Sequence, residues 1–168
     1  MALTKQLAAF DGPAYVRMGR GAVPDVYRGD EDFVLGKAYQ LQDGKDLTLI
    51  ACGEMVYYAA EAAKLLEAMG LSARVLDMHT VKPLDEEAVL KAARDTGLIV
   101  TVEEHMVHGG LGSAVTELLS DQLPVPVKIL ALPDENIIAG TSTELFAHYH
   151  LDAQGICDAA TAMVKKFK

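Results

Sequence analysis

The sequence predicts an α/β domain built on a mainly parallel sheet with helices on both faces. From residue 47 onward, short apolar runs alternate with amphipathic segments, and polar residues or glycines follow most of the runs. Short apolar strands separated by single helices are typical of a parallel sheet that is buried on both faces. Right-handed crossovers then place the loops that follow the strands at one edge of the sheet. We expect functional residues at that edge.

Four apolar runs are the expected strands. The helix over residues 54–69 is followed by Gly70, a residue typical of helix C-caps. Asp85 can cap a second helix, which Gly97 ends, and a third begins after a glycine loop near residue 110. A last helix, Asp152–Phe167, is expected to turn Ile156, Cys157, Ala160, Met163, Val164 and Phe167 inward. The strands are Leu47–Ala51, Ala73–Met78, Leu98–Val102 and Val127–Leu132.

The first 46 residues have a different organisation. Thr4–Phe10 reads as the end of a helix, Ala14–Met18 as a strand, and Gly19–Asp32 as a linker with three glycines and Pro24. A linker joins two domains, yet a helix and a strand are too little to form a domain. We therefore expect residues 1–32 to be the trailing segment of a preceding domain plus its linker, and residues 33–168 to be the α/β domain.

Composition excludes several classes of protein. A chain of 168 residues with 51% hydrophobic residues suits one globular domain, and a net charge of −9 argues against nucleic acid or an anionic membrane as a partner. No apolar run approaches the ~18 residues of a membrane span, and the first residues do not resemble a signal peptide. Cys52 and Cys157 lack metal-ligand spacing, and we expect both to be reduced core residues. These features favour a cytoplasmic protein.

Three motifs carry a family resemblance. They are GPAYVRMGRGAVP (residues 12–24), ARVLDMHTVKPLDEEAV (73–89) and VTVEEHMVHGGLGSAV (100–115). In this order they resemble the C-terminal part of the transketolase-like family of thiamine-diphosphate enzymes, and DMHTVKPLD is most similar to the C-terminal subunit of two-subunit transketolases. The resemblance implies a three-layer α/β/α fold with a mostly parallel five-stranded sheet. Deoxyxylulose-phosphate synthase, a 2-oxoacid dehydrogenase E1 β subunit and a non-catalytic binding module remain alternatives.

The resemblance also implies an activity that this chain does not perform alone. A transketolase transfers a two-carbon ketol unit between sugar phosphates, as in the pentose phosphate pathway, with thiamine diphosphate and Mg²⁺. The family's diphosphate and pyrimidine domains hold that cofactor, and their motifs are absent here. We therefore expect no catalytic, cofactor-binding or metal-binding residue on this chain. The expected partners are those missing domains or a subunit carrying them, a second copy in a homodimer, and phosphorylated sugars in the assembled enzyme.

Two arginines are the candidate site residues. The resemblance implies that Arg20, four residues before Pro24, binds the phosphate of the sugar substrate, and that Arg17 could assist. A guanidinium suits this task because its planar fork meets phosphate oxygens with paired, charge-assisted hydrogen bonds. The alternative is that both are solvated surface cations or that they pair with Asp11 and Asp25.

A run of polar residues follows the third strand. Glu103, Glu104 and His105 could act in acid–base catalysis or bind a metal, with His108 as a further ligand. Adjacent strand residues point to opposite faces, however, so the two glutamates should not converge. The structural alternative, which also covers His79, is a role in the sheet edge and the dimer interface.

The glycines near residue 110 are a further candidate feature. The dinucleotide-binding pattern from Gly110 fails at Val115, where it needs a small residue. The backbone amides at this helix start could hold an anion, while close packing or a tight turn is the simpler explanation.

Overall fold

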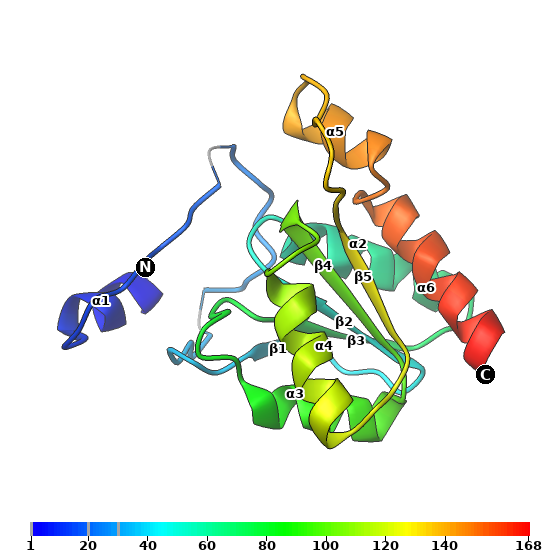
Figure 1. The fold of residues 1–168 in the computed structure, drawn as a ribbon, viewed down its shortest axis with the longest axis horizontal. Coiled ribbons are helices and arrows are strands. Elements are labelled where there is room, and N and C mark those ends of the chain that lie inside the picture. The colour runs from blue at the N-terminus through cyan, green and yellow to red at the C-terminus, as the bar shows by residue number, and fades with distance from the viewer. Residues whose placement is uncertain (1, 20, 30) are drawn as a thin grey trace.

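The fold is a five-stranded, mostly parallel sheet, as predicted (Figure 1). The computed structural model describes residues 2–19, 21–29 and 31–168. The strand order is β1-β3-β2-β4-β5, with β1 antiparallel to β3 and every other pair parallel. The strands are β1 (Tyr39–Gln42), β2 (Leu47–Ala51), β3 (Ala73–Asp77), β4 (Ile99–Met106) and β5 (Val127–Leu132).

Two pairs of helices cover the sheet and give the three expected layers (Figure 1). On one face, α2 (Met55–Ala68) and α6 (Ala153–Phe167) pack on the larger core cluster. On the other face, α3 (Glu86–Thr96) and α4 (Leu111–Gln122) pack on the second cluster. Every residue of β2 is buried: Leu47, Leu49 and Ala51 belong to the larger cluster and Ile50 to the second. This double burial explains why a central parallel strand such as β2 is almost entirely apolar.

The helix caps predicted at Asp85, Gly97 and Gly70 are confirmed. The Asp85 carboxylate caps α3 by accepting the backbone N–H of Ala88 at 3.3 Å. Gly97 ends the same helix with a φ of 69°, and Gly70 follows α2 with a φ of 81°. Both conformations lie in the left-handed region, where glycine avoids the steric penalty of a Cβ atom.

The expected strand Ala14–Met18 is wrong. A short helix, α1 (Ala2–Ala9), precedes it, and the segment itself is extended but unpaired, with Tyr15 90% and Met18 82% exposed. Its apolar pattern suits a strand, but no strand of the described chain lies beside it to complete a ladder. Tyr39–Gln42, which the pattern analysis missed, is the fifth strand instead. We call residues 10–18 the arm.

The linker after the arm folds back onto the domain. The rings of Tyr27, Phe33, Tyr39 and His79 form a cluster with centroid distances of 5.1 to 6.3 Å. The Tyr27 hydroxyl donates a hydrogen bond to Asp77 at the end of β3, at 2.8 Å. Aromatic packing and this hydrogen bond therefore join the linker to the sheet.

The C-terminal part departs from the prediction in two places. A helix between β5 and α6, α5 (Ser142–His148), was not expected, although Thr141 and Glu144 form a capping box at its start. Phe167 is 46% exposed rather than inward, because it is the last residue of α6. Within the described chain, no helix combines the length and apolar character needed to cross a membrane.

Candidate functional site at the carboxyl edge of the sheet

The parallel strands deliver polar residues to one edge of the sheet, as expected. Cys52 follows β2, Asp77 ends β3, and Glu103 and Glu104 lie in the last part of β4. The pairing of β4 with β5 is irregular between Val102 and Met106, so these glutamates lie where the ladder is interrupted. We call this region the carboxyl edge.

Glu103 binds the start of helix α4. Its side chain is 2% exposed, and its carboxylate accepts the backbone N–H groups of Leu111 at 2.7 Å and Gly112 at 2.8 Å. A carboxylate is favourable there because a helix N-terminus carries unpaired N–H donors and a partial positive charge. These two amides therefore already hold an anion, which is part of the chain itself.

The glycines of the loop permit this close approach. A Cβ atom on Gly110 would lie 2.0 Å from Glu103 Oε2, and one on Gly112 would lie 2.5 Å from Ile129 Cγ2. Both distances are far below van der Waals contact, so neither position accepts a side chain without a shift of its neighbours. This confirms the close-packing interpretation of these glycines.

Glu104 and His105 do not converge with Glu103. Glu104 faces the arm, and Arg17 Nη2 donates to its Oε2 at 3.3 Å. His105 is exposed, with its Nδ1 3.2 Å from the carbonyl oxygen of Met106. Over residues 2–19, 21–29 and 31–168, no three His, Cys, Asp or Glu side chains are placed to hold a metal ion.

The other polar groups of the carboxyl edge are packed into the fold. Burial, followed by the charges of Glu103 and Asp77, raises the pKa of the Cys52 thiol to about 12. At neutral pH this thiol is protonated and is a poor nucleophile. His79 packs against Phe33, and its Nδ1 lies 3.0 Å from Thr80 Oγ1. Both cysteines are free thiols.

The structure describes one of the two candidate arginines, Arg17. Arg17 pairs with Glu104 across 87 residues of sequence, and its side chain remains 52% exposed. In the described part of the chain it forms no ion pair with Asp11 or Asp25. Arg20 lies outside the described residues.

The family model of the transketolase C-terminal domain matches residues 36–156, which is most of the chain. The chain belongs to this family. It is 56% identical over 165 residues to one subunit of the apulose-4-phosphate transketolase of Phocaeicola vulgatus, covering 98% of this chain and 53% of that protein. It is 42% identical over 154 residues to a 1-deoxy-D-xylulose-5-phosphate synthase of Heliobacterium modesticaldum, covering 90% of this chain and 24% of that protein.

A solved structure agrees with this assignment. This chain superposes on the solved structure of a split-gene transketolase, an inactive beta4 tetramer, with a TM-score of 0.89 and 43% sequence identity. The match covers 98% of this chain and 53% of that one. The chain thus spans about half the length of the Phocaeicola vulgatus subunit and of the split-gene transketolase chain.

Motif residues of this transketolase C-terminal domain shape its fold. Asp85 of the PLD motif caps α3 and also accepts the backbone N–H of Ala38 at 2.9 Å, just before β1. Lys37 adds a contact to the same carboxylate at 3.5 Å. Asp85 therefore joins the residues just before β1 to the start of α3, a role that the helix-cap pattern predicts only in part.

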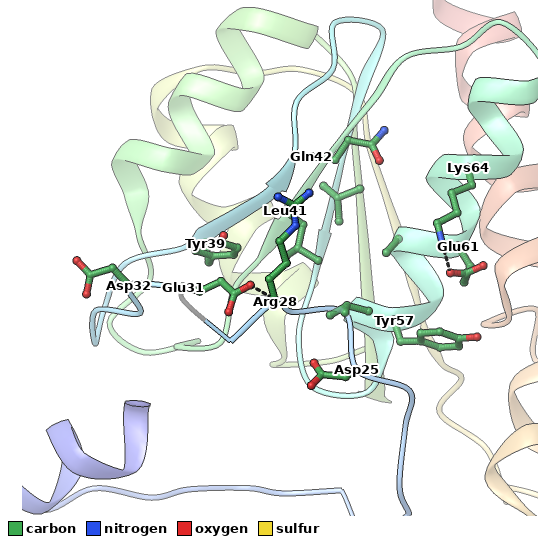
Figure 2. A pocket seen from close by; sticks show the side chains of 13 residues that line it. Asp25, Arg28, Glu31, Asp32, Tyr39, Leu41, Gln42, Tyr57, Glu61 and Lys64 are labelled. Carbon is green, nitrogen blue, oxygen red and sulfur yellow. Dashed lines mark hydrogen bonds and ion pairs between the residues drawn. The ribbon is translucent and has the colours of Figure 1, made fainter. Parts of the chain in front are cut away.

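A groove of about 650 Å³ lies between the linker, β1 and α2 (Figure 2). The Arg28 side chain extends over Leu41 at its centre, and Tyr39 and Tyr57 lie on different sides (Figure 2). In this groove Glu61 forms an ion pair with Lys64 at 2.6 Å, and the Glu31 carboxylate accepts the backbone N–H of Gly29 at 2.9 Å. The sequence does not predict this groove, since it forms only when the linker folds back.

Proposed function

We propose that this chain is the C-terminal part of a transketolase, which transfers a two-carbon ketol unit between sugar phosphates. The main support is the similarity over 98% of the chain to one subunit of a transketolase. The chain spans 53% of that relative, so the activity belongs to a larger assembly. We further propose that the assembly is cytoplasmic, works in sugar-phosphate metabolism of the pentose phosphate type and contains this chain as a homodimer.

Thiamine diphosphate is the cofactor that the family implies for the full enzyme, where it supplies the carbanion chemistry. The described residues do not fit a site for it or its Mg²⁺: no acidic cluster is placed to hold a metal, and Glu103 occupies amides at the start of α4. We therefore assign the cofactor to the diphosphate and pyrimidine domains, and we expect this chain alone to be inactive.

We propose that residues 1–32 are, in structural terms, the end of the pyrimidine domain. The arm leaves Tyr15 and Met18 almost fully exposed, whereas the apolar runs of the domain are buried. Large exposed apolar side chains in an extended segment are typical of a surface that another domain or subunit covers. The arm and linker then form the tail of the pyrimidine domain, and residues 33–168 form the C-terminal domain.

Within the assembly, Arg20 and Arg17 are proposed to bind the phosphate of the sugar substrate. Phosphate lies far from the reacting carbons, and binding energy from such a remote group positions the carbons for reaction. The exposed guanidinium of Arg17 supports this role, because Glu104 occupies one of its donors and leaves others for a second partner.

The test is Arg20→Ala in the assembled enzyme. We expect the KM for xylulose 5-phosphate to rise about tenfold or more, because charge-assisted hydrogen bonds are lost, while the KM for unphosphorylated xylulose changes little. Steady-state kinetics with both sugars measure this, and Arg94→Ala, an exposed arginine on α3, is the matched control. Equal effects on the two sugars would contradict the assignment.

The alternative activity is that of deoxyxylulose-phosphate synthase or a 2-oxoacid dehydrogenase. The similarity to the Heliobacterium modesticaldum synthase supports deoxyxylulose-phosphate synthase as the alternative activity. Both act on pyruvate-type substrates, so assaying the assembled enzyme with pyruvate against ketose phosphates separates them from a transketolase. Turnover of ketose phosphates without pyruvate supports the transketolase.

A further inference from the structure

We propose that Glu104 is a positioning residue for the substrate phosphate, acting through Arg17 and assisted by Glu54. This inference rests on the proposed function, in which the segment around Arg17 and Arg20 binds that phosphate. It concerns how the α/β domain holds the segment, which is otherwise an exposed arm.

The first observation is the ion pair itself. Arg17 Nη2 lies 3.3 Å from Glu104 Oε2, and the two side chains are 52% and 25% exposed. Glu104 is the less exposed partner and belongs to a strand of the sheet, β4. The arm has no backbone pairing with the sheet, so this contact fixes the direction of Arg17 from outside the arm.

The second observation is a contact two residues further along the chain. A Cβ atom on Gly19 would lie 2.4 Å from Glu54 Oε1 and 3.0 Å from Glu54 Cδ, so the backbone of Gly19 rests against that carboxyl group. Glu54 is the N-cap residue of α2, on the same edge of the sheet. The chain thus contacts the carboxyl edge at residues 17 and 19, by an ion pair at the first and by close packing at the second.

The charges at this junction favour the arrangement. Two carboxyl groups of the carboxyl edge face one cation: burial and then the charge of Glu104 raise the pKa of Glu54, while Arg17 lowers it. Removing Arg17 would leave like charges near each other, so the cation is the group that joins the arm to the edge. An exposed pair of this kind contributes little to folding, and its effect should therefore be on placement.

The test compares Glu104→Ala, Arg17→Ala and the double variant in the assembled enzyme. We expect Glu104→Ala to raise the KM for xylulose 5-phosphate about two- to fivefold, the range of one partly exposed ion pair, with kcat and the KM for xylulose unchanged. In the Arg17→Ala background, Glu104→Ala should add nothing. Glu67→Ala, an exposed glutamate on α2, is the matched control.

A second readout does not depend on activity. Trypsin must extract the Arg17 side chain from its pair with Glu104, so cleavage after Arg17 in the free chain should be faster in Glu104→Ala and unchanged in Glu67→Ala. Mass spectrometry of timed digests measures the rates.

The outcomes separate the two proposals. Unchanged cleavage, a lower KM, or full additivity with Arg17→Ala overturns the positioning role of Glu104. An unchanged KM in Glu104→Ala, with Arg20→Ala still selective for the phosphorylated sugar, overturns it as well and leaves the proposed function in place. If neither arginine variant distinguishes the two sugars, the phosphate assignment fails, and this inference fails with it.

Discussion

At the scale of single residues, two adjacent glutamates on β4 have separate tasks. Glu103 is buried and satisfies two backbone donors of α4, whereas Glu104 is partly exposed and pairs with the arm. Their separation follows from strand geometry, because neighbouring side chains point to opposite faces. The expected stability contributions differ accordingly, since a buried donor without a partner costs far more than a lost surface pair.

We predict that Glu103→Ala destabilises the domain by about 3 kcal/mol, because it leaves two buried N–H groups without acceptors. Urea unfolding followed by circular dichroism measures this. Glu104→Ala is the matched control and should cost less than about 1 kcal/mol. Similar losses in the two variants would show that Glu103 is not the acceptor that the α4 amides need. Glu103→Gln, which keeps one acceptor oxygen, should fall between them.

Residue-scale features were predictable where their signal is local. The caps at Asp85 and Gly97 and the close packing of Gly112 follow from short patterns. The hydrogen bonds from the α4 amides to Glu103 could not be predicted without knowing that β4 continues beyond Val102. The partner of Arg17 was not predictable, because the contact spans 87 residues and depends on where the arm lies.

At the scale of elements, the junction between β3 and the linker contains a buried carboxyl group, Asp77, and we expect its stability to depend on pH. Asp77 is 3% exposed, and burial raises its pKa above the ordinary value of 3.8, although the Tyr27 hydrogen bond and His79 oppose the shift. The folded protein therefore binds this proton more tightly than the unfolded chain does. The contribution of Asp77 to stability is greatest below its ordinary pKa and falls as pH rises through the folded-state pKa.

Asp77→Asn should remove this fall. The amide oxygen can still accept the Tyr27 hydroxyl, but the side chain no longer ionises, so the free energy of unfolding of the variant relative to the original should increase with pH. Urea unfolding at intervals from about pH 4 to pH 7 tests this, across the range where carboxyl groups titrate. Asp121→Asn, on the exposed face of α4, is the control. A constant difference between variant and original would contradict the prediction.

Element-scale prediction succeeded for the parallel strands and failed at the margins of the sheet. Four strands were found because each is mostly apolar, and three of them, β2, β3 and the first part of β4, are buried on both faces. Strand β1, with the sequence YQLQ, is short, half-polar and antiparallel, so it lacks that signal. Helix α5 was missed although its capping box is visible in the sequence. The groove beside β1 depends on the linker, whose path no local pattern specifies.

At the scale of the whole molecule, the C-terminal domain and the arm differ in how they bury apolar surface. The domain has a core on each face of its sheet, whereas the arm runs outside these layers (Figure 1). Tyr15, Val16 and Met18 of the arm are exposed apolar side chains. This contrast agrees with a chain that spans about half the length of the Phocaeicola vulgatus subunit and of the split-gene transketolase chain.

We predict that replacing both Tyr15 and Met18 with serine weakens assembly with the cofactor-binding part of the enzyme. The loss should be about tenfold or more in affinity, from two apolar side chains that are no longer buried. The melting temperature of the free chain should not change, because both side chains are already exposed. Isothermal titration calorimetry measures the affinity, and Phe167→Ser, at the exposed end of α6, is the control. Unchanged affinity would place the partner elsewhere.

The carboxylate of Glu103 is a tethered ligand at the start of α4. Tethering gives it an effective local concentration far above that of any free metabolite, so a soluble anion would have to displace a group that never diffuses away. The sheet edge where open α/β folds commonly receive phosphates is therefore closed to them at this helix. In the proposed assembly, recognition of a phosphorylated substrate would therefore depend on the two arginines that precede the domain, Arg17 and Arg20.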